Sequence, residues 1–190
     1  MPEAPFGKRL NLPQSEGRFI RLEHKGDKLR FRIANTPHYQ TKHFLDDKTT
    51  VFCGKYNTDD KKATCRYCDQ YKKLFDEKGK KAADHLKPVM TFYYPIVNID
   101  TNEPQIFQFN APSIHYTFVD YDDEGIDVFS CNWSVERTEE PGNYYNIKRL
   151  SDKPLNPEQL KSLEVAKTFK LASKKSSSVV ISPGDEGKDE

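Results

Sequence analysis

The stretch from His43 to Cys68 constrains this chain more than any other, because it holds three of the four cysteines. Cys65 and Cys68 form a C-x-x-C pair, which places two thiolates on one side of a tight turn where they can share a metal ion. Cys53 lies upstream across a polar loop, and His43 lies ten residues before it. Three sulfurs and an imidazole make a closed tetrahedral set, which is typical of structural Zn²⁺ and leaves no position for a substrate water. We therefore expect a structural zinc ion held by His43, Cys53, Cys65 and Cys68.

The fourth ligand and the chemistry of the thiols both have alternatives. His38 is also close to the first cysteine, but His43 is favoured because it immediately precedes the short strand that leads to Cys53. A C-x-x-C pair can be a redox pair instead, although no βαβ pattern surrounds this one. A third interpretation is that the thiols are unrelated to one another.

The length of the chain predicts one domain with appendages, since it has 190 residues. Residues 1–16 contain three prolines and one basic pair, and we expect them to form a flexible arm. The core is expected at residues 17–172, with the zinc insertion at about 38–86. Residues 173–190 have the composition of a disordered tail tipped by acids.

The compartment can also be predicted from the sequence. Residues 1–10 lack the apolar run of a signal peptide, and no segment approaches the length of a membrane span. The cysteines are spaced for a metal rather than for disulfides. We therefore expect a cytoplasmic protein with no membrane partner.

The net charge of +1 hides opposite local charges. Residues 1–34 hold eight Lys or Arg and four acids, and residues 55–81 hold nine Lys or Arg and five acids. Residues 119–140 hold eight acids and one Arg. A molecule with basic and acidic regions can hold a polyanion in one place without being basic overall. The alternative is that each region is ordinary solvated surface charge.

Hydrophobic patterning predicts a mainly β chain with a few helices. Alternation and turn residues predict strands in hairpins at residues 18–24, 28–34, 87–100, 105–110, 126–138 and 144–150. Helical patterns predict helices at residues 69–86, 111–122 and 157–172, the last with Asn156 as its N-cap. Strands in hairpins that are interrupted by a metal-bound insertion predict an α+β fold built on a small closed or partly open β-barrel.

Local features of these elements lead to three further expectations. Alternation in residues 28–34 places three apolar side chains toward the core, and Arg30 and Arg32 toward solvent. Pro95 predicts an edge position or a bulge in its strand. Gly79 predicts a break in the first helix.

Aromatic residues make up 12% of a chain that is 35% hydrophobic, which indicates more rings than a small core needs. Where two rings are consecutive in a strand, their side chains point to opposite faces, so we expect one of each pair to leave the core. Exposed rings beside Arg and Lys suit sequence-tolerant binding of a single strand, because bases stack on rings while cations neutralise phosphates. The candidate contacts are Arg18, Arg21, Arg30, Arg32, Phe92, Tyr93, Tyr94, Phe107, Tyr144, Tyr145, Lys148 and Arg149. The alternative is that the rings cover the core at strand edges.

Several segments resemble the single-stranded DNA-binding (helix-destabilising) proteins of tailed phages. The matching pieces are H-F…V-F-C…C-R-Y-C, T-F-Y-Y-P-I-V, and D-V-F-S-C-N-W followed by N-Y-Y, within roughly residues 18–150. The resemblance implies an OB-fold-like barrel with an inserted zinc subdomain, to which the patterning adds a C-terminal helix. It also implies that Cys131 is not a metal ligand.

The same resemblance implies partners. Single-stranded DNA is the expected ligand, with self-association on DNA through the arm and contacts of the tail with replication or recombination proteins. The sequence differs from the family at both ends, since its arm has little more than the basic pair Lys8-Arg9 and its tail is short.

We therefore predict a non-enzymatic protein that coats single-stranded DNA without sequence preference during phage DNA replication, recombination or repair, in the host cytoplasm. A zinc-stapled module that binds RNA or protein is the first alternative. A zinc-dependent nuclease is the second, but it needs an open metal site and acid–base carboxylates. The acidic cluster at residues 120–124 has the pattern of a turn instead.

Overall fold

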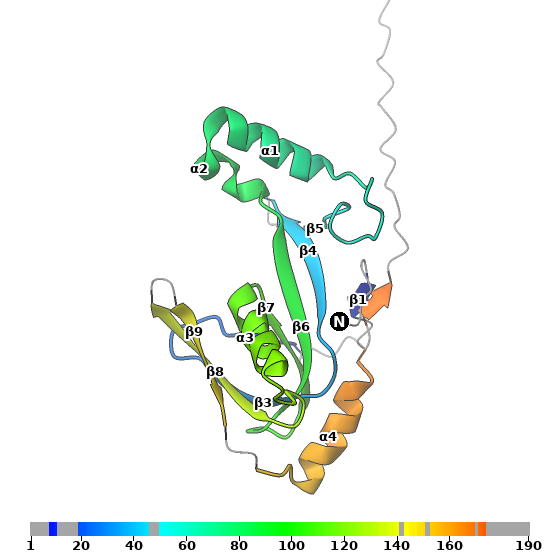
Figure 1. Ribbon diagram of the computed structural model, residues 1–190, viewed down its shortest axis with the longest axis vertical. Coiled ribbons are helices and arrows are strands. Elements are labelled where there is room, and N and C mark those ends of the chain that lie inside the picture. Colours follow the sequence, from blue (N-terminus) through cyan, green and yellow to red (C-terminus); the bar gives the residue numbers. More distant parts are fainter. Residues whose placement is uncertain are drawn as a thin grey trace, which may run out of the picture.

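The computed structural model describes residues 8–10, 19–45, 50–140, 143–150, 153–169 and 171–173. It is a mixed α+β structure dominated by one strand-rich sheet, so the predicted α+β class is confirmed (Figure 1). In chain order the elements are β1 (Lys8–Leu10), β2 (Phe19–Ile20), β3 (Lys28–Ile33), β4 (His38–Phe44), β5 (Thr50–Phe52), α1 (Arg66–Lys78), α2 (Lys80–Ala83), a 3₁₀ turn (Asp84–Leu86), β6 (Val89–Asn98), β7 (Pro104–Phe109), α3 (Pro112–Asp123), β8 (Asn132–Glu140), β9 (Asn143–Arg149), α4 (Pro157–Lys167) and β10 (Leu171–Ser173).

The main sheet is built around β6. The strand path runs β2-β7-β6-β3-β8-β9, and β4 joins it along β6 with β5 at its own outer edge. Strand β6 pairs antiparallel with β7 on one side and with both β4 and β3 on the other. Among the described strands, β2 and β9 at the two ends of the path do not pair with each other, so the sheet is not closed.

Pro95 lies inside this central strand, and the predicted edge position or bulge is wrong. On one side Pro95 lies opposite Ile106 in an unbroken ladder with β7. Its carbonyl oxygen faces the other side and accepts a hydrogen bond from the Ala34 N–H at 2.8 Å. On that side the partner changes from β4, whose pairing ends at Tyr93, to β3, whose pairing begins at Ile96. The missing proline N–H therefore falls at a gap between two partner strands, where a ladder hydrogen bond is not lost.

The predicted hairpin between residues 18–24 and 28–34 is also wrong. Strand β3 lies between β6 and β8, so it has no free edge for a further partner. The chain before it reaches the outer edge of β7 instead, where β2 pairs in parallel. The turn between the two segments docks on β8, because the Gly26 N–H donates to the carbonyl of Arg137 at 2.8 Å.

The main hydrophobic core lies on the face of the sheet that α3 covers. Ile114 and Phe118 of α3 pack there against the inward side chains of β3, β6, β7 and β8. Trp133 is fully buried in this core, and its indole N–H donates to the carbonyl of Val128 at 3.0 Å. The helix expected at residues 111–122 is thus confirmed, and it closes the core.

A second hydrophobic cluster covers the opposite face of β6. Tyr93 of β6 and Ile106 of β7 pack there with Ala166 of α4 and with Phe169, which follows that helix. Residues 92–94 are consequently all buried. The expectation that one ring of this run leaves the core is wrong, because α4 covers a face that alternation alone predicts to be exposed.

Several local predictions are confirmed. The apolar side chains of β3 are buried, whereas Arg30 is exposed and Arg32 is half-buried. Gly79 ends α1 and separates it from α2 with a φ of 79°, a conformation that favours glycine. Asn156 caps α4 in a reciprocal pair with Gln159, in which each side chain accepts a hydrogen bond from the other's backbone N–H.

Part of the expected flexible arm has regular structure. Lys8–Leu10 form β1, which pairs antiparallel with β10 at the boundary of the predicted tail. The rest of the arm and the remainder of the tail lie outside the described residues.

A buried polar contact joins α3 to the core. The Tyr94 hydroxyl lies 2.7 Å from Nδ1 of His115, and the imidazole stacks on Phe92 with ring centroids 4.7 Å apart. Burial raises the pKa of Tyr94, so this hydroxyl stays protonated and can donate to a neutral imidazole. Burial also lowers the pKa of His115 from its ordinary value of 6.5.

His115 is therefore expected to make folding pH-dependent. Because its pKa is lower in the folded chain, the unfolded chain binds the proton more readily, and the unfolding free energy falls as the pH drops below about 6.5. Denaturant unfolding of wild type and His115→Asn, at about pH 7.5 and about pH 5.5, tests this, because the variant cannot titrate in this range. The stability advantage of the wild type should shrink at the lower pH. An equal difference at both pH values contradicts the expectation.

Candidate metal centre and nucleic-acid interface

Four residues of the metal stretch bring their ligand atoms together. His43 lies on β4, Cys53 follows β5, Cys65 is the N-cap of α1, and Cys68 lies in the first turn of that helix. The β4–β5 hairpin brings the first two together, and one turn of α1 brings the last two together. All four ligand atoms lie within 4.8 Å of one another, so this group could hold a metal ion.

Three of the spacings between these atoms fit a tetrahedral ion. Sγ of Cys53 and Sγ of Cys68 are 3.4 Å apart. Nε2 of His43 lies 3.4 Å from Sγ of Cys65 and 3.6 Å from Sγ of Cys68. Ligands at bond lengths of about 2.0–2.3 Å around a tetrahedral ion lie roughly 3.3–3.8 Å apart. The donor set and its spacing therefore suit a metal ion bound by protein ligands alone.

The orientation of His43 is set from outside the ligand group. Its Nδ1 lies 2.8 Å from the carbonyl oxygen of Leu86, to which it donates when the proton is on that nitrogen. That tautomer leaves the Nε2 lone pair directed at the sulfurs, as metal-binding histidines require. His38 is five residues away on the same strand, pairs with Tyr93 and is not part of the cluster. The preference for His43 over His38 is thus supported by geometry.

The loop after Cys53 is held by two local constraints. A Cβ on Gly54 would lie 2.9 Å from the carbonyl oxygen of Thr64, so this close approach requires glycine. The amide of Asn57 forms two hydrogen bonds with the backbone of Thr41, accepting from its N–H at 2.7 Å and donating to its carbonyl at 2.6 Å. These contacts fix the loop to β4, which carries His43.

The electrostatics of the cluster favour a bound cation. Burial, together with the neighbouring thiols, raises the pKa of Cys68 well above its ordinary value, and burial also raises the pKa of Cys53. Burial acts in the same direction on Cys65, but backbone hydrogen bonds from Cys68 and Gly54 outweigh it and the pKa of Cys65 is lowered. Three thiolates in this volume repel one another, so a metal ion is needed to keep them ionised together.

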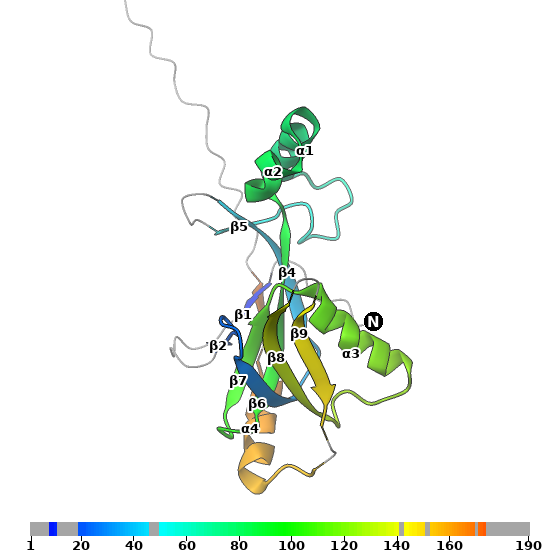
Figure 2. The ribbon, with the colours of Figure 1, turned by 90° about the vertical axis from the view of Figure 1, so that its left-hand side faces the viewer.

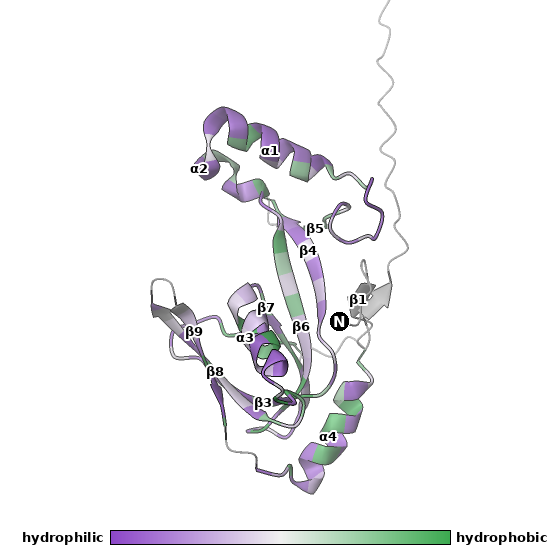
Figure 3. Ribbon diagram, in the orientation of Figure 1, coloured by the Kyte–Doolittle hydropathy of each residue, from purple (hydrophilic) through white to green (hydrophobic). Residues whose placement is uncertain are grey.

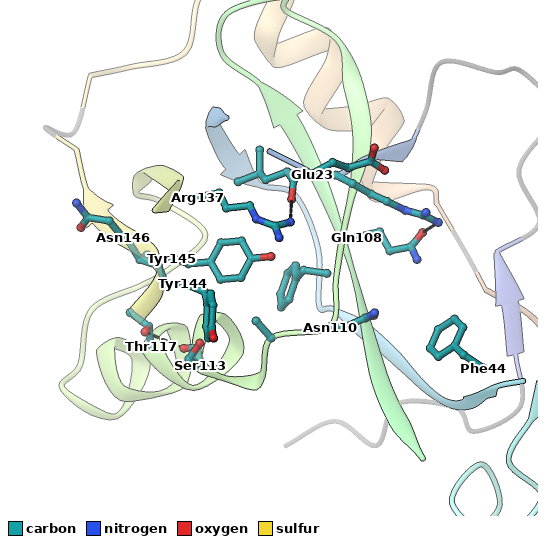
Figure 4. Close-up of a pocket in the computed structure, with 15 residues that line it drawn as sticks. Glu23, Phe44, Gln108, Asn110, Ser113, Thr117, Arg137, Tyr144, Tyr145 and Asn146 are labelled. Atoms are coloured by element: carbon teal, nitrogen blue, oxygen red, sulfur yellow. Dashed lines mark hydrogen bonds between the residues drawn. The ribbon is translucent and has the colours of Figure 1, made fainter. Parts of the chain in front are cut away.

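A groove of about 690 Å³ lies where the two ends of the strand path approach each other (Figure 4). One wall is formed by the segment after β2 and the end of β7, and the other by β8, β9 and the start of α3. The lining residues are Arg21, Leu22, Glu23, Phe44, Gln108, Phe109, Asn110, Ala111, Ser113, Thr117, Arg137, Tyr144, Tyr145, Asn146 and Ile147.

Two arginines hold the walls of this groove in place. The guanidinium of Arg21 donates to the side-chain oxygen of Gln108 at 2.8 Å. The guanidinium of Arg137 donates to the carbonyl oxygen of Leu22 at 2.9 Å and so links β8 to the segment after β2. Tyr144 is 57% exposed at the rim. The groove thus combines exposed aromatic surface with two cationic side chains and one acidic side chain.

Three of the predicted nucleic-acid contacts meet in this groove. Arg21, Tyr144 and Tyr145 all line it, and Tyr145 is half-buried against the main core while its neighbour is exposed. This pair of tyrosines therefore behaves as the alternation of strand residues predicts.

Four predicted rings are buried instead. Phe92, Tyr94 and Phe107 belong to the main core, and a ring with no exposed face cannot stack on a base. Tyr93 is buried in the second cluster, where Lys42 hydrogen-bonds its hydroxyl. The assignment of these four rings as base-stacking residues is corrected, because α3 covers one face of β6 and α4 covers part of the other.

The remaining predicted cations lie elsewhere. Arg30 forms an ion pair with Asp100, and Arg32 donates to the side chain of Asn132 at 3.0 Å. Lys148 and Arg149 are exposed on β9 but do not line the groove. Arg18 lies outside the described residues. Among the predicted cations that the structure describes, Arg21 is thus the one that lines the groove.

Phe44 and Arg137 line the groove but were missed in the sequence. The sequence does distinguish Arg137, because it is the one Lys or Arg within the acidic residues 119–140. Phe44 directly follows the metal ligand His43, and nothing in its local pattern distinguishes it from a core residue.

Comparisons with protein-family models and with curated proteins find no match for this chain. None of the described helices is both long enough and apolar enough to cross a membrane.

The metal site leads to a direct prediction. We expect one metal ion per chain in protein prepared under reducing conditions without chelators, and we expect Cys65→Ser to lose it. Metal binding is worth on the order of 10 kcal/mol in small metal-bound modules, so the loss should unfold residues 43–86 and leave the main core folded. Elemental analysis measures the first effect, and hydrogen exchange measures the second.

Cys131→Ser is the matched control. Cys131 is buried in the main core and is not part of the cluster, so this variant should keep its metal. Wild-type protein without metal, or Cys65→Ser protein that retains it, contradicts the assignment.

Proposed function

We propose that this protein binds single-stranded DNA without sequence preference and acts as a non-enzymatic coat protein in phage DNA replication, recombination or repair, in the host cytoplasm. The observation that carries the proposal is the groove in which Tyr144 and Tyr145 lie with Arg21 and Arg137. Single-strand binding without sequence preference commonly uses aromatic rings on which bases stack, beside cationic side chains that bind phosphates.

The surroundings of the groove also support this proposal. Tyr144 is exposed, and the hydrogen bond from Arg21 to Gln108 leaves further donors on the Arg21 guanidinium for a phosphate. Residues from both ends of the strand path line the groove, which supports a curved, partly open OB-like barrel as the finer description of the sheet.

The metal ion in this proposal is a structural zinc. Thiolate and imidazole ligands in a closed set of four favour zinc over the hard cations, which prefer oxygen ligands. Its proposed work is to hold the β4–β5 hairpin and α1 together. A set of four protein ligands leaves no position for a substrate, which argues against the nuclease alternative.

Single substitutions should separate stacking from charge. On a dT oligonucleotide of about 8 nucleotides, Tyr144→Ala should cost about 1–3 kcal/mol and leave the salt dependence unchanged, because a ring carries no charge. Arg21→Ala should reduce the slope of log affinity against log salt by about 0.7, because one phosphate contact is lost. Fluorescence titration at several salt concentrations measures both quantities.

Tyr116→Ala is the matched control, because Tyr116 is an equally exposed tyrosine outside the groove. It should bind this short oligonucleotide as the wild type does. If Tyr144→Ala and Arg21→Ala also bind normally while folded, the groove is not a DNA site. Preference for an rU over a dT oligonucleotide favours the RNA-binding alternative instead.

A further inference from the structure

Phe44 belongs to both the metal stretch and the groove. Among the residues that line the groove, it is the one that comes from the stretch between His43 and Cys68. Its ring is 42% exposed, although Figure 3 shows β4 as mostly hydrophilic beside the more hydrophobic β6. Figure 4 shows Phe44 at one end of the groove and the two tyrosines at the other, with Asn110 between them. The groove therefore has two separate aromatic positions.

His43 and Phe44 are neighbours on β4, but their surroundings differ. His43 is fully buried, and its Nε2 lies beside the sulfurs of Cys65 and Cys68 in the metal cluster. Successive side chains of a strand point to opposite faces, so Phe44 is directed away from the cluster. It lines the groove instead. The end of this strand thus supplies the metal cluster on one face and the groove on the other.

The β4–β5 hairpin determines where Phe44 lies. The ladder between β4 and β6 ends at Lys42, so His43 and Phe44 lie beyond it and, among the described strands, pair with β5 alone. Strand β5 leads directly to Cys53, so each strand of the hairpin carries or precedes one ligand of the proposed ion. Figure 1 and Figure 2 both show the hairpin between α1 and the part of the sheet that α3 covers. An ion shared by His43 and Cys53 therefore fixes the hairpin, and with it the ring of Phe44.

We propose that Phe44 is a third base-stacking residue of the groove, and that the metal ion keeps its ring in place by holding the β4–β5 hairpin. The inference rests on the proposed function, because it requires a single strand in the groove. A phenylalanine ring stacks on any base, as the tyrosine rings do. Phe44 and the tyrosine pair lie at opposite ends of the groove, so they take different bases of one strand. Metal and DNA then bind cooperatively although they share no ligand atom.

A tryptophan reporter tests whether a base reaches this position. The chain has a single tryptophan, Trp133, which is fully buried in the main core. The added emission of Phe44→Trp over the wild type therefore comes from the groove. A dT oligonucleotide of about 8 nucleotides should quench this added emission, because the base stacks on the indole. Unchanged emission from a variant that binds the oligonucleotide overturns the proposal.

Affinities for the same oligonucleotide test whether the ring contributes to binding. Phe44→Ala should bind about 5–150-fold more weakly, with an unchanged slope of log affinity against log salt. Phe44→Leu keeps apolar bulk without a ring and should also bind weakly, whereas Phe44→Trp should bind as the wild type does. Phe129→Ala is the matched control, because Phe129 is also 42% exposed but does not line the groove. Wild-type affinity of Phe44→Ala or of Phe44→Leu overturns the proposal.

The metal affinity provides a readout that does not depend on DNA affinity. Coupling between two sites is reciprocal, so bound DNA must strengthen metal binding by the factor by which metal strengthens DNA binding. Equilibrium competition with a chelator, with and without saturating oligonucleotide, measures that factor. We expect a rise of about 5–150-fold for the wild type and little rise for Phe44→Ala. No rise in the wild type, or an equal rise in both proteins, overturns the role of the metal in placing Phe44.

The outcomes distinguish this inference from the proposed function. If Tyr144→Ala and Arg21→Ala both bind the oligonucleotide normally while folded, the groove is not a DNA site and both proposals fail. If Tyr144→Ala binds weakly while Phe44→Ala binds normally, the DNA site remains but is restricted to the tyrosine end. That second result overturns the assignment of Phe44 alone.

Discussion

Burial of β6 on both faces is the constraint on which the rest of this structure depends. Residues 91–98 are all buried, with α3 over one face and α4 over part of the other. The same strand holds β7 on one side, and β4 and β3 in succession on the other. Because β4 carries His43 and pairs with β6, the metal module continues the sheet. Strand β6 therefore connects β4, which carries the metal module, to the strands of the core and of the groove.

The metal cluster replaces a hydrophobic core in the module that β6 supports. Helix α1 has no fully buried side chain and only half-buried ones such as Tyr71 and Leu74, so it gains less from the hydrophobic effect than a core helix does. The module also buries His43, Cys53 and Cys65, whose ligand atoms lie close together. A metal ion bound by all of them would stabilise this arrangement. Holding the helix by its first turn leaves its remaining length exposed.

The groove forms where the two ends of the strand path of the sheet approach each other. Parallel addition of β2 to β7 brings the segment that follows it toward β8 and β9, and Arg137 holds it there through Leu22. Rings and cations then line the open end of the core rather than a flat sheet face. Helix α3 closes the core beside this groove and directs its acids away from the sheet. The parallel pairing of β2 with β7 thus positions one wall of the proposed binding site.

Features whose chemistry lies within a short stretch were predictable from the sequence alone. The ligand set spans 26 residues, the alternation of β3 needs six, and the Asn156 cap needs four, so local spacing encodes each of them. Pro95, β2 and Tyr93 were predicted wrongly because their positions depend on partners distant in sequence, namely the junction of β4 and β3, the edge of β7, and α4. Tyr144 and Arg21 were identified by type, but only tertiary structure joins them to Phe44 and Arg137. Period-two alternation tells which side chains share a face of a strand, whereas what covers that face is decided by packing.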